Sequence, residues 1–136
     1  MEATVSASNL ILVLVVEDNT IIRQNVEDAL SDGGYAVETA STGEEAIGLL
    51  DAADAGFSAL ITDINLAPGK LDGWDVARHA RELKPELPIV YMTGANGDHW
   101  ASQGVPKSLL LSKPFASAQL VTAVSQLLNS QVSSGD

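Results

Sequence analysis

Residues 10–16 read Leu-Ile-Leu-Val-Leu-Val-Val, a run in which every side chain is apolar. Such a run is typical of a central strand of a parallel sheet, covered on both faces, and it is too short for a buried helix. It is also far shorter than the roughly 20 residues of a membrane-spanning helix. The residues before it include an acid but no Lys or Arg, unlike a secretory signal. We therefore expect a cytoplasmic domain without a membrane partner.

Segments of strand and helix character alternate along the whole chain. Strands are predicted at residues 10–16, 35–40, 58–62, 89–93 and 109–111. Helices are predicted at residues 19–32, from 42 to near 56, 73–84 and 117–128. This alternation favours parallel βαβ units, and so an α/β three-layer sandwich with a five-stranded parallel sheet flanked by helices. We expect one domain at residues 10–129, between a flexible N-terminal segment (1–9) and a flexible C-terminal tail (130–136).

The overall charge excludes several kinds of partner. The 136 residues contain 7 Lys and Arg against 18 Asp and Glu, which gives a net charge of −11. A chain this acidic repels phosphate backbones and anionic membranes, so we expect no nucleic-acid partner. There is no Cys, which excludes disulfides, thiolate metal sites and Cys nucleophiles.

Polar side chains able to do chemistry stand where the predicted strands end. Glu17 and Asp18 follow the first strand, Asp63 the third, Thr93 ends the fourth and Lys113 follows the fifth. In an open parallel sheet these ends share one edge, and ligands bind there. Each residue alone has an ordinary explanation, as a helix cap, a strand terminus or a solvated lysine. Their placement together at one edge is harder to attribute to chance.

This combination of groups predicts phosphoryl chemistry. Clustered carboxylates raise one another's pKa unless a cation lies between them. Oxygen ligands without His or Cys favour Mg²⁺. One carboxylate can then attack a phosphoryl group, while a metal, an amine and a hydroxyl stabilise the transferring oxygens. The pattern therefore predicts a phosphoryl-accepting aspartate.

The chain resembles the receiver domain of two-component response regulators from about Ile11 to Leu128. The matching motifs are Val15-Val-Glu-Asp-Asn19, Leu60-Ile-Thr-Asp63, Asp72-Gly73, Met92-Thr-Gly94 and Lys113-Pro-Phe115. The resemblance implies a flavodoxin-like sheet of strand order 2-1-3-4-5. It also implies that Asp63 is phosphorylated by a phosphohistidine, carried by a sensor histidine kinase or a histidine phosphotransfer protein.

The resemblance further implies a Mg²⁺ site. Asp18, Asp63 and the backbone carbonyl of Asn65 would bind the ion directly, and Glu17 would hold a metal-bound water. The ion would be the cofactor of the phosphorylation of Asp63.

The remaining site residues would act on the phosphoryl group. Lys113 would pair with it, Thr93 would move to form a hydrogen bond to it, and the Lys113–Pro114 peptide would be cis. The protein would be a signalling switch and not an enzyme, catalysing only its own phosphorylation and dephosphorylation. Since no output domain follows the last helix, we expect a stand-alone receiver, or one excised from a hybrid kinase, that signals by partner binding or phosphorelay.

The chain departs from the family pattern in three places. The family usually has a Tyr or Phe three residues before the lysine, where this chain has Leu110. Tyr91, expected in the core, and Trp100 are the candidates to replace that aromatic residue. Residues 67–71 look like an insertion after the third strand. Residues 94–104 are rich in weak helix formers, which predicts a short fourth helix and an unusual output surface.

Two other functions compete with a receiver. A haloacid-dehalogenase-like small phosphatase also uses an aspartyl nucleophile, but it needs Asp-x-Asp, and this chain reads Asp63-Ile-Asn65. A degenerate receiver would bind partners without phosphorylation. The presence of Asp18, Asp63, Thr93 and Lys113 argues against it.

Overall fold

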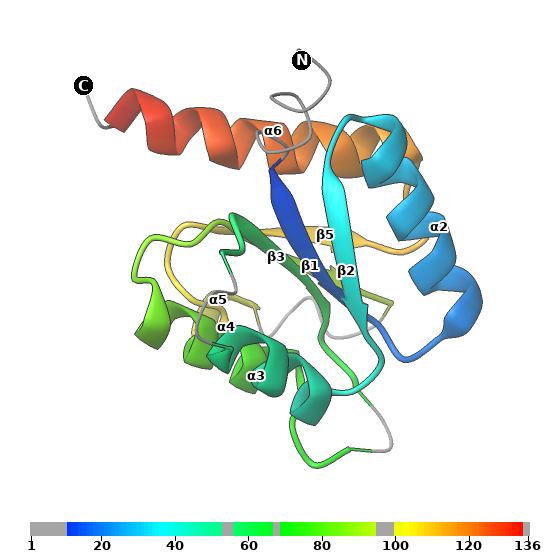
Figure 1. Cartoon of the computed structure of the whole chain (residues 1–136), viewed down its shortest axis with the longest axis vertical. Helices are drawn as coiled ribbons and strands as arrows, with labels where there is room; N and C mark the ends of the chain where they lie inside the picture. The colour runs from blue at the N-terminus through cyan, green and yellow to red at the C-terminus, as the bar shows by residue number, and fades with distance from the viewer. Residues whose placement is uncertain (1–10, 53–55, 67–68, 95–99, 135–136) are drawn as a thin grey trace.

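A computed structural model describes residues 11–52, 56–66, 69–94 and 100–134. Five parallel strands form one sheet in the order β2-β1-β3-β4-β5, so the predicted α/β fold and strand order are confirmed (Figure 1). The strands are β1 (Leu12–Val16), β2 (Ala36–Ala40), β3 (Ala59–Asp63), β4 (Ile89–Thr93) and β5 (Ser108–Ser112). The helices are α2 (Thr20–Asp32), α3 (Gly43–Asp51), α4 (Gly73–Leu83), α5 (Trp100–Gln103) and α6 (Ser117–Ser134).

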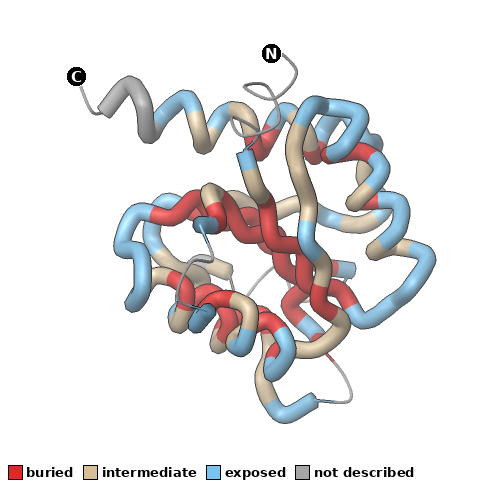
Figure 2. Tube along the Cα trace, viewed as in Figure 1, coloured by how far each residue is buried: buried red, intermediate tan, exposed pale blue. Residues whose placement is uncertain are grey.

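The sheet separates two apolar cores. In β1, Val13 and Val15 pack with α2 and α6 on one face, whereas Leu14 and Val16 pack with α3 and α4 on the other. All four side chains are fully buried, as the predicted two-sided strand requires. Figure 2 shows the same arrangement, with buried residues concentrated in the central strands and exposed ones on the outer turns of the helices.

Side-chain caps begin three of the helices. The Asn19 side chain accepts a hydrogen bond from the Ile22 N–H, and the Thr42 side chain accepts one from the Glu45 N–H. The carboxylate of Glu45 accepts from the Ser41 N–H and not from that of Thr42, so Thr42 and Glu45 do not form a reciprocal capping box. A reciprocal box that sequence reasoning missed joins Asp72 and Asp75 at the start of α4.

The last helix is longer than predicted. It ends at Ser134 and not at Leu128, and so includes most of the expected tail. No Gly or Pro occurs from Ser117 to Ser134, and Gly135 is the first helix-stopping residue after them. Among the described residues, no helix has both the length and the apolar character needed to cross a bilayer.

Gly73 sets how closely the loop after β3 returns to the sheet. Its N–H donates to the Ile64 carbonyl over 2.8 Å. A Cβ added at Gly73 would lie 2.1 Å from the backbone oxygen of Asp63, closer than any real contact. Only glycine therefore lets α4 begin directly against the end of β3.

Substitution of Gly73 tests this close approach. Gly73→Ala should destabilise the fold by about 1–3 kcal/mol, because backbone and not a flexible side chain must move. Gly48 in α3 is a matched control, since a Cβ there meets nothing within 4 Å. Gly48→Ala should stabilise by about 0.5–1 kcal/mol through helix propensity. Urea unfolding of both variants measures the difference, and equal effects would contradict the packing argument.

Candidate functional site

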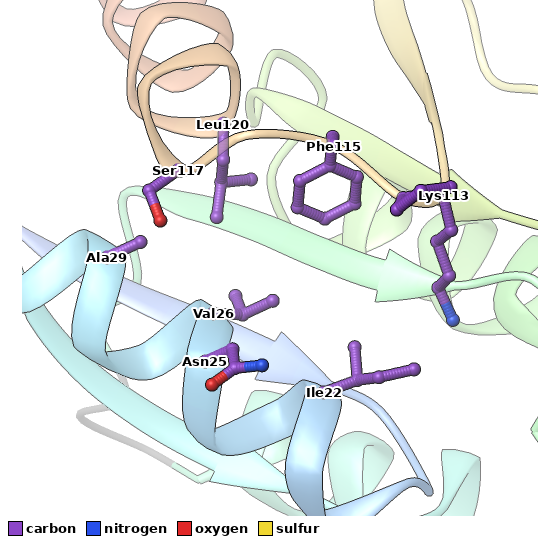
Figure 3. A pocket seen from close by; sticks show the side chains of 9 residues that line it. Ile22, Asn25, Val26, Ala29, Lys113, Phe115, Ser117 and Leu120 are labelled. Carbon is purple, nitrogen blue, oxygen red and sulfur yellow. The ribbon is translucent and has the colours of Figure 1, made fainter.

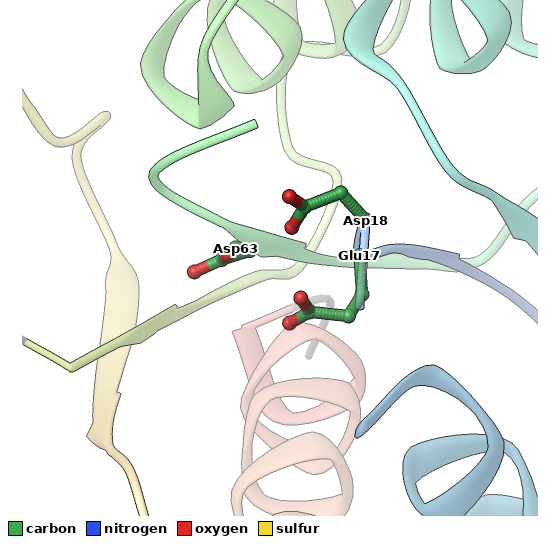
Figure 4. Close-up of side chains that lie close together, drawn as sticks. All are labelled: Glu17, Asp18 and Asp63. Carbon is green, nitrogen blue, oxygen red and sulfur yellow. The ribbon is translucent and has the colours of Figure 1, made fainter. Parts of the chain in front are cut away.

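Three carboxylates meet at the carboxyl edge of the sheet. Glu17 and Asp18 follow β1, and Asp63 is the last residue of β3, one residue beyond the predicted end of that strand. Because β1 pairs with β3, with Val16 opposite Thr62, the three acids become neighbours. One carboxylate oxygen from each lies within 4.8 Å of the others (Figure 4).

These carboxylates differ in exposure. Glu17 and Asp63 are buried, at 1% and 6% exposed, whereas Asp18 is exposed. A group that enters from solvent therefore meets Asp18 first and the two buried acids behind it.

Lys113 brings a positive charge to this cluster. Its Nζ donates to Glu17 Oε1 over 2.9 Å and lies 3.3 Å from Asp63 Oδ1. The backbone anchors it, because the Lys113 N–H donates to the Thr93 carbonyl over 2.7 Å. The Lys113–Pro114 peptide is cis, as predicted.

Burial and Lys113 shift the pKa values of the two buried acids in opposite directions. Burial raises the pKa values of Glu17 and Asp63, and Lys113 offsets this only in part. Burial also acts to lower the pKa of Lys113, but its hydrogen bond to Glu17 and the charge of Asp63 outweigh this and raise it. The lysine is thus held as a cation, while two acids share one compensating charge.

The loop after β1 is held by hydrogen bonds on both sides of Glu17. Glu17 Oε2 accepts from the Asn19 N–H over 3.1 Å. The Glu17 carbonyl accepts from the Arg23 guanidinium over 2.8 Å. Arg23 is half-buried, and its side chain supports the site directly.

Thr93 and Asn65 flank Asp63 as expected from the sequence. Thr93 is buried at the end of β4, directly after Met92, which pairs with Asp63. Asn65 is exposed two residues after Asp63, and the preceding Ile64 N–H donates to the Met92 carbonyl. All of the predicted site residues thus lie at one edge of the sheet, and the roles predicted for Thr93 and Asn65 stay predictions.

The carboxylate cluster fits a hard divalent cation. Its ligand atoms are all oxygens, two of its acids are desolvated, and one side is open to solvent waters. Mg²⁺ prefers this set, in which one or two carboxylates bind and waters complete the shell. When bound, such an ion supplies charge neutralisation to oxygens that approach Asp63.

Comparison with known proteins agrees with this geometry. The family model "Response regulator receiver domain" matches residues 13–125. The chain belongs to this family.

The chain is similar to a receiver protein of known structure and to parts of two longer curated proteins. A crystal structure of a response regulator receiver protein from Sinorhizobium medicae is 45% identical, with a TM-score of 0.86, over 90% of this chain and 97% of that one. The chain is 32% identical to the response regulator MprA of Mycolicibacterium vanbaalenii, over 85% of its length and 49% of the relative. It is 28% identical to the sensor kinase CckA of Brucella abortus, over 96% of its length but 14% of the relative. The chain thus spans half or less of these two curated relatives.

A further structural neighbour was solved with a metal ion bound. The receiver domain of the sensor histidine kinase PA1611 from Pseudomonas aeruginosa was solved with a magnesium ion in its active-site cleft. It shares 25% identity and a TM-score of 0.75, over 88% of this chain and 98% of that one. Receivers bind Mg²⁺ at an acidic pocket, and this receiver has such a pocket.

The position three residues before Lys113, where the family usually has an aromatic residue, is aliphatic in this receiver. Leu110 is half-buried and packs against the same core as Trp100 and Val105. Tyr91 is fully buried, as predicted, with its ring centroid 4.7 Å from that of Trp74. Its hydroxyl accepts from the Val105 N–H over 3.1 Å. Tyr91 is thus a buried core residue whose hydroxyl ties β4 to the segment after α5.

The helix α5 is short, as the sequence predicts. α5 has four residues, and residues 95–99 lie outside the described part of the receiver. The Trp100 Nε1–H donates to Ser108 Oγ over 2.9 Å, and Ser108 Oγ–H donates to the Val105 carbonyl over 2.7 Å. These two bonds fasten α5 to the start of β5.

Two contacts outside the site join separate elements. His79 Nε2 lies 2.7 Å from Asp51 Oδ1, which joins α4 to α3. Within the insertion at residues 67–71, the Lys70 N–H donates to Glu44 over 2.9 Å. This bond is the main reason that the pKa of Glu44 is lowered.

Magnesium should stabilise this receiver against heat. A raised pKa means that the folded state holds the proton more tightly than the unfolded chain, so ionising Glu17 and Asp63 costs stability at neutral pH. A cation that binds only the folded state offsets this cost. The melting temperature should rise with millimolar Mg²⁺, and the rise should shrink as pH falls and protons compete for the buried acids.

Two exposed aspartates allow a controlled version of this experiment. Asp18→Ala should blunt the Mg²⁺ response, whereas Asp28→Ala, which removes an exposed acid from α2, should leave it intact. Differential scanning calorimetry at neutral and mildly acidic pH measures both. A melting temperature independent of Mg²⁺ in the wild type would rule out the metal site.

Proposed function

We propose that this receiver takes a phosphoryl group onto Asp63 from a phosphohistidine of a sensor histidine kinase or a histidine phosphotransfer protein. The observation that supports the proposal most strongly is the position of Asp63. It is a buried carboxylate 3.3 Å from the Lys113 ammonium and grouped with two further acids. A desolvated carboxylate beside a cation is suited to nucleophilic attack on an anionic phosphoryl group.

The chemistry is an exchange of one phosphorus bond for another. An oxygen of Asp63 attacks the phosphorus, an O–P bond forms as the N–P bond breaks, and the electron pair stays on the imidazole nitrogen, which takes a proton from solvent. Lys113 is positioned to pair with a phosphoryl oxygen when it gives up part of its contact with Glu17 and Asp63. Thr93, at the end of the neighbouring strand, would donate a hydrogen bond to another oxygen. Mg²⁺ held by Asp18, Asp63 and the Asn65 carbonyl, with Glu17 on a bound water, would neutralise the remaining charge.

The receiver is proposed to act as a switch and not as an enzyme. It would catalyse only its own phosphorylation and dephosphorylation, and signal by partner binding or by onward phosphotransfer in the cytoplasm. Asn65 stands where a haloacid-dehalogenase-like phosphatase has its acid, which argues against sustained turnover of small phosphoesters.

Acetyl phosphate, a small phosphoryl donor, tests the acceptor without a kinase. Incubation with acetyl phosphate and Mg²⁺ should add one phosphoryl group to the wild type, seen by intact mass and removed by hydroxylamine. Asp63→Asn should abolish the adduct, because an amide is a poor nucleophile. Asp28→Asn is the matched control and should be phosphorylated normally. Wild-type phosphorylation of the Asp63 variant would refute the assignment, and continuous phosphate release would favour the phosphatase.

A hollow beside the site offers a docking place for the donor. It encloses about 190 Å³ between α2 and the loop after β5 (Figure 3). Ile22 and Val26 form one wall, Phe115 and Leu120 the other, and Lys113 lies at its end. An apolar helix surface that presents a phosphohistidine would fit against these walls and reach toward Lys113 and Asp63.

Ile21 is the residue best suited to test docking. Ile22 lines the hollow, whereas the neighbouring Ile21 is 73% exposed. Ile21 stands one helical turn before Asn25, which also lines the hollow. An exposed isoleucine at its rim is available to a partner.

Ile21→Glu should slow phosphotransfer from the kinase or phosphotransfer protein by about tenfold, because a charge replaces an apolar contact. Transfer from acetyl phosphate should be unchanged. Leu83→Glu is the control, since Leu83 is also an exposed apolar residue, but on α4. Arg23 is unsuitable for this test because its side chain holds the Glu17 carbonyl. Equal losses with both donors would place the effect on the site and not on docking.

A further inference from the structure

The loop between β3 and α4 is fastened to the molecule at two places. Its base is closed by the hydrogen bond from the Gly73 N–H to the Ile64 carbonyl. Further out, Glu44 Oε2 at the start of α3 accepts a hydrogen bond from the Lys70 N–H over 2.9 Å. Figure 1 shows this part of the loop, in green, beside the first turn of α3. We use the name Glu44 anchor for this contact between α3 and the loop.

The Glu44 anchor acts on the backbone of the loop. The Lys70 N–H contributes most to lowering the pKa of Glu44, and the Leu71 N–H contributes less. The carboxylate therefore stays ionised at neutral pH and is a strong acceptor for these N–H groups. Because its partners are main-chain groups, the anchor restrains the path of the loop and not only the position of one side chain.

Glycines on both sides of the contact allow the loop to approach α3 closely. A Cβ added at Gly43 would lie 2.8 Å from the Leu71 Cβ and 3.0 Å from the Leu71 carbonyl oxygen. A Cβ added at Gly69 would clash with Glu44 Oε1. The backbones of the helix start and of the loop can meet because neither glycine carries a side chain.

Glu45, the neighbour of Glu44 on the same helical turn, bonds only locally. Its carboxylate accepts from the N–H and the hydroxyl of Ser41. Its N–H donates to the Thr42 hydroxyl, which caps the helix. The start of α3 is thus capped without Glu44, and the Glu44 side chain is left to hold the loop.

The anchored loop carries Asn65, whose backbone carbonyl is a ligand of Mg²⁺ in the function proposed above. The inner part of the loop is held by packing, because Ile64 and Leu66 on either side of Asn65 are buried. Asn65 itself is exposed, and so is Lys70 in the outer part of the loop. The hydrogen bond from Lys70 to Glu44 restrains this exposed part, which would otherwise be free to move the backbone next to Asn65.

We propose that Glu44 is a positioning residue of the cation site, which holds the loop so that the site selects Mg²⁺ over Ca²⁺. The proposal rests on the metal-binding role proposed for the Asn65 carbonyl. Among the described residues, the acids that group closely enough to hold an ion are Glu17, Asp18 and Asp63, so Glu44 acts through the loop and not as a ligand.

The two cations differ in how much ligand movement they tolerate. Mg²⁺ requires a nearly regular octahedron of ligands at about 2.1 Å, whereas Ca²⁺ accepts irregular shells at about 2.3–2.6 Å. Loosening one ligand therefore weakens the binding of Mg²⁺ more than that of Ca²⁺. Removal of a negative charge near the site would instead weaken the binding of both ions alike.

Calorimetric titration of the full chain with Mg²⁺ and, separately, with Ca²⁺ tests the proposal. Glu44→Ala should weaken Mg²⁺ binding about fivefold or more but Ca²⁺ binding less than about twofold, because the loop ligand is no longer held. Glu44→Gln removes the same charge but keeps an oxygen acceptor, so its loss of Mg²⁺ affinity should be clearly smaller. Glu45→Gln is the matched control, since it removes a charge from the same turn, and it should bind both ions like the wild type.

A second measurement examines the anchor without any metal. In the metal-free protein, amide hydrogen exchange at Lys70 should be faster in Glu44→Ala than in the wild type and unchanged in Glu45→Gln. Melting curves confirm that all variants are folded. Unchanged exchange at Lys70 in Glu44→Ala would overturn the proposal.

The titrations separate failure of this inference from failure of the proposed function. Wild-type Mg²⁺ affinity in Glu44→Ala, an equal loss of both ions, or equal losses in Glu44→Ala and Glu44→Gln would overturn the role of Glu44 alone. A wild type that binds no Mg²⁺ would overturn this role together with the metal site of the proposed function.

Discussion

The ion pair of Lys113 with Glu17 and Asp63 is the interaction around which the acidic edge is organised. Two desolvated carboxylates would repel each other strongly without it, and their raised pKa values show that one lysine compensates them only in part. The remaining negative charge is what makes the pocket suited to a divalent cation. In the proposed phosphorylated state, the same lysine would give up part of its contact with these acids and pair with the phosphoryl group.

The backbone around this ion pair brings the charged residues to one edge of the sheet. Parallel pairing of β1 with β3 brings Glu17 and Asp63 together, and the N–H of Lys113 is fastened to the Thr93 carbonyl. Gly73 lets α4 return within contact of the Asp63 backbone. The main chain therefore sets where each charged side chain begins, and the contacts of Lys113 with Glu17 and Asp63 fix where these side chains end.

The residues that would link the site to a partner surface differ from the pattern implied by the family resemblance. Leu110 offers neither a ring nor a hydroxyl, and the buried Tyr91 is already committed to Trp74 and to the Val105 N–H. Tyr91 lies two residues before Thr93 on β4. A movement of Thr93 that also shifts Tyr91 would change the hydrogen bond of Tyr91 to the segment after α5.

The sequence alone was sufficient for the fold class, the strand order through the family resemblance, and the identity of the acidic cluster, because apolar periodicity and residues at strand ends are local signals. It also predicted the buried position of Tyr91. It could not decide which of Ile21 and Ile22 is exposed, or whether Arg23 supports Glu17. Those outcomes depend on how α2 rotates against the sheet and on which carbonyls lie within reach of a long side chain. Such contacts join residues that no sequence spacing relates, and only the packed tertiary structure brings them together.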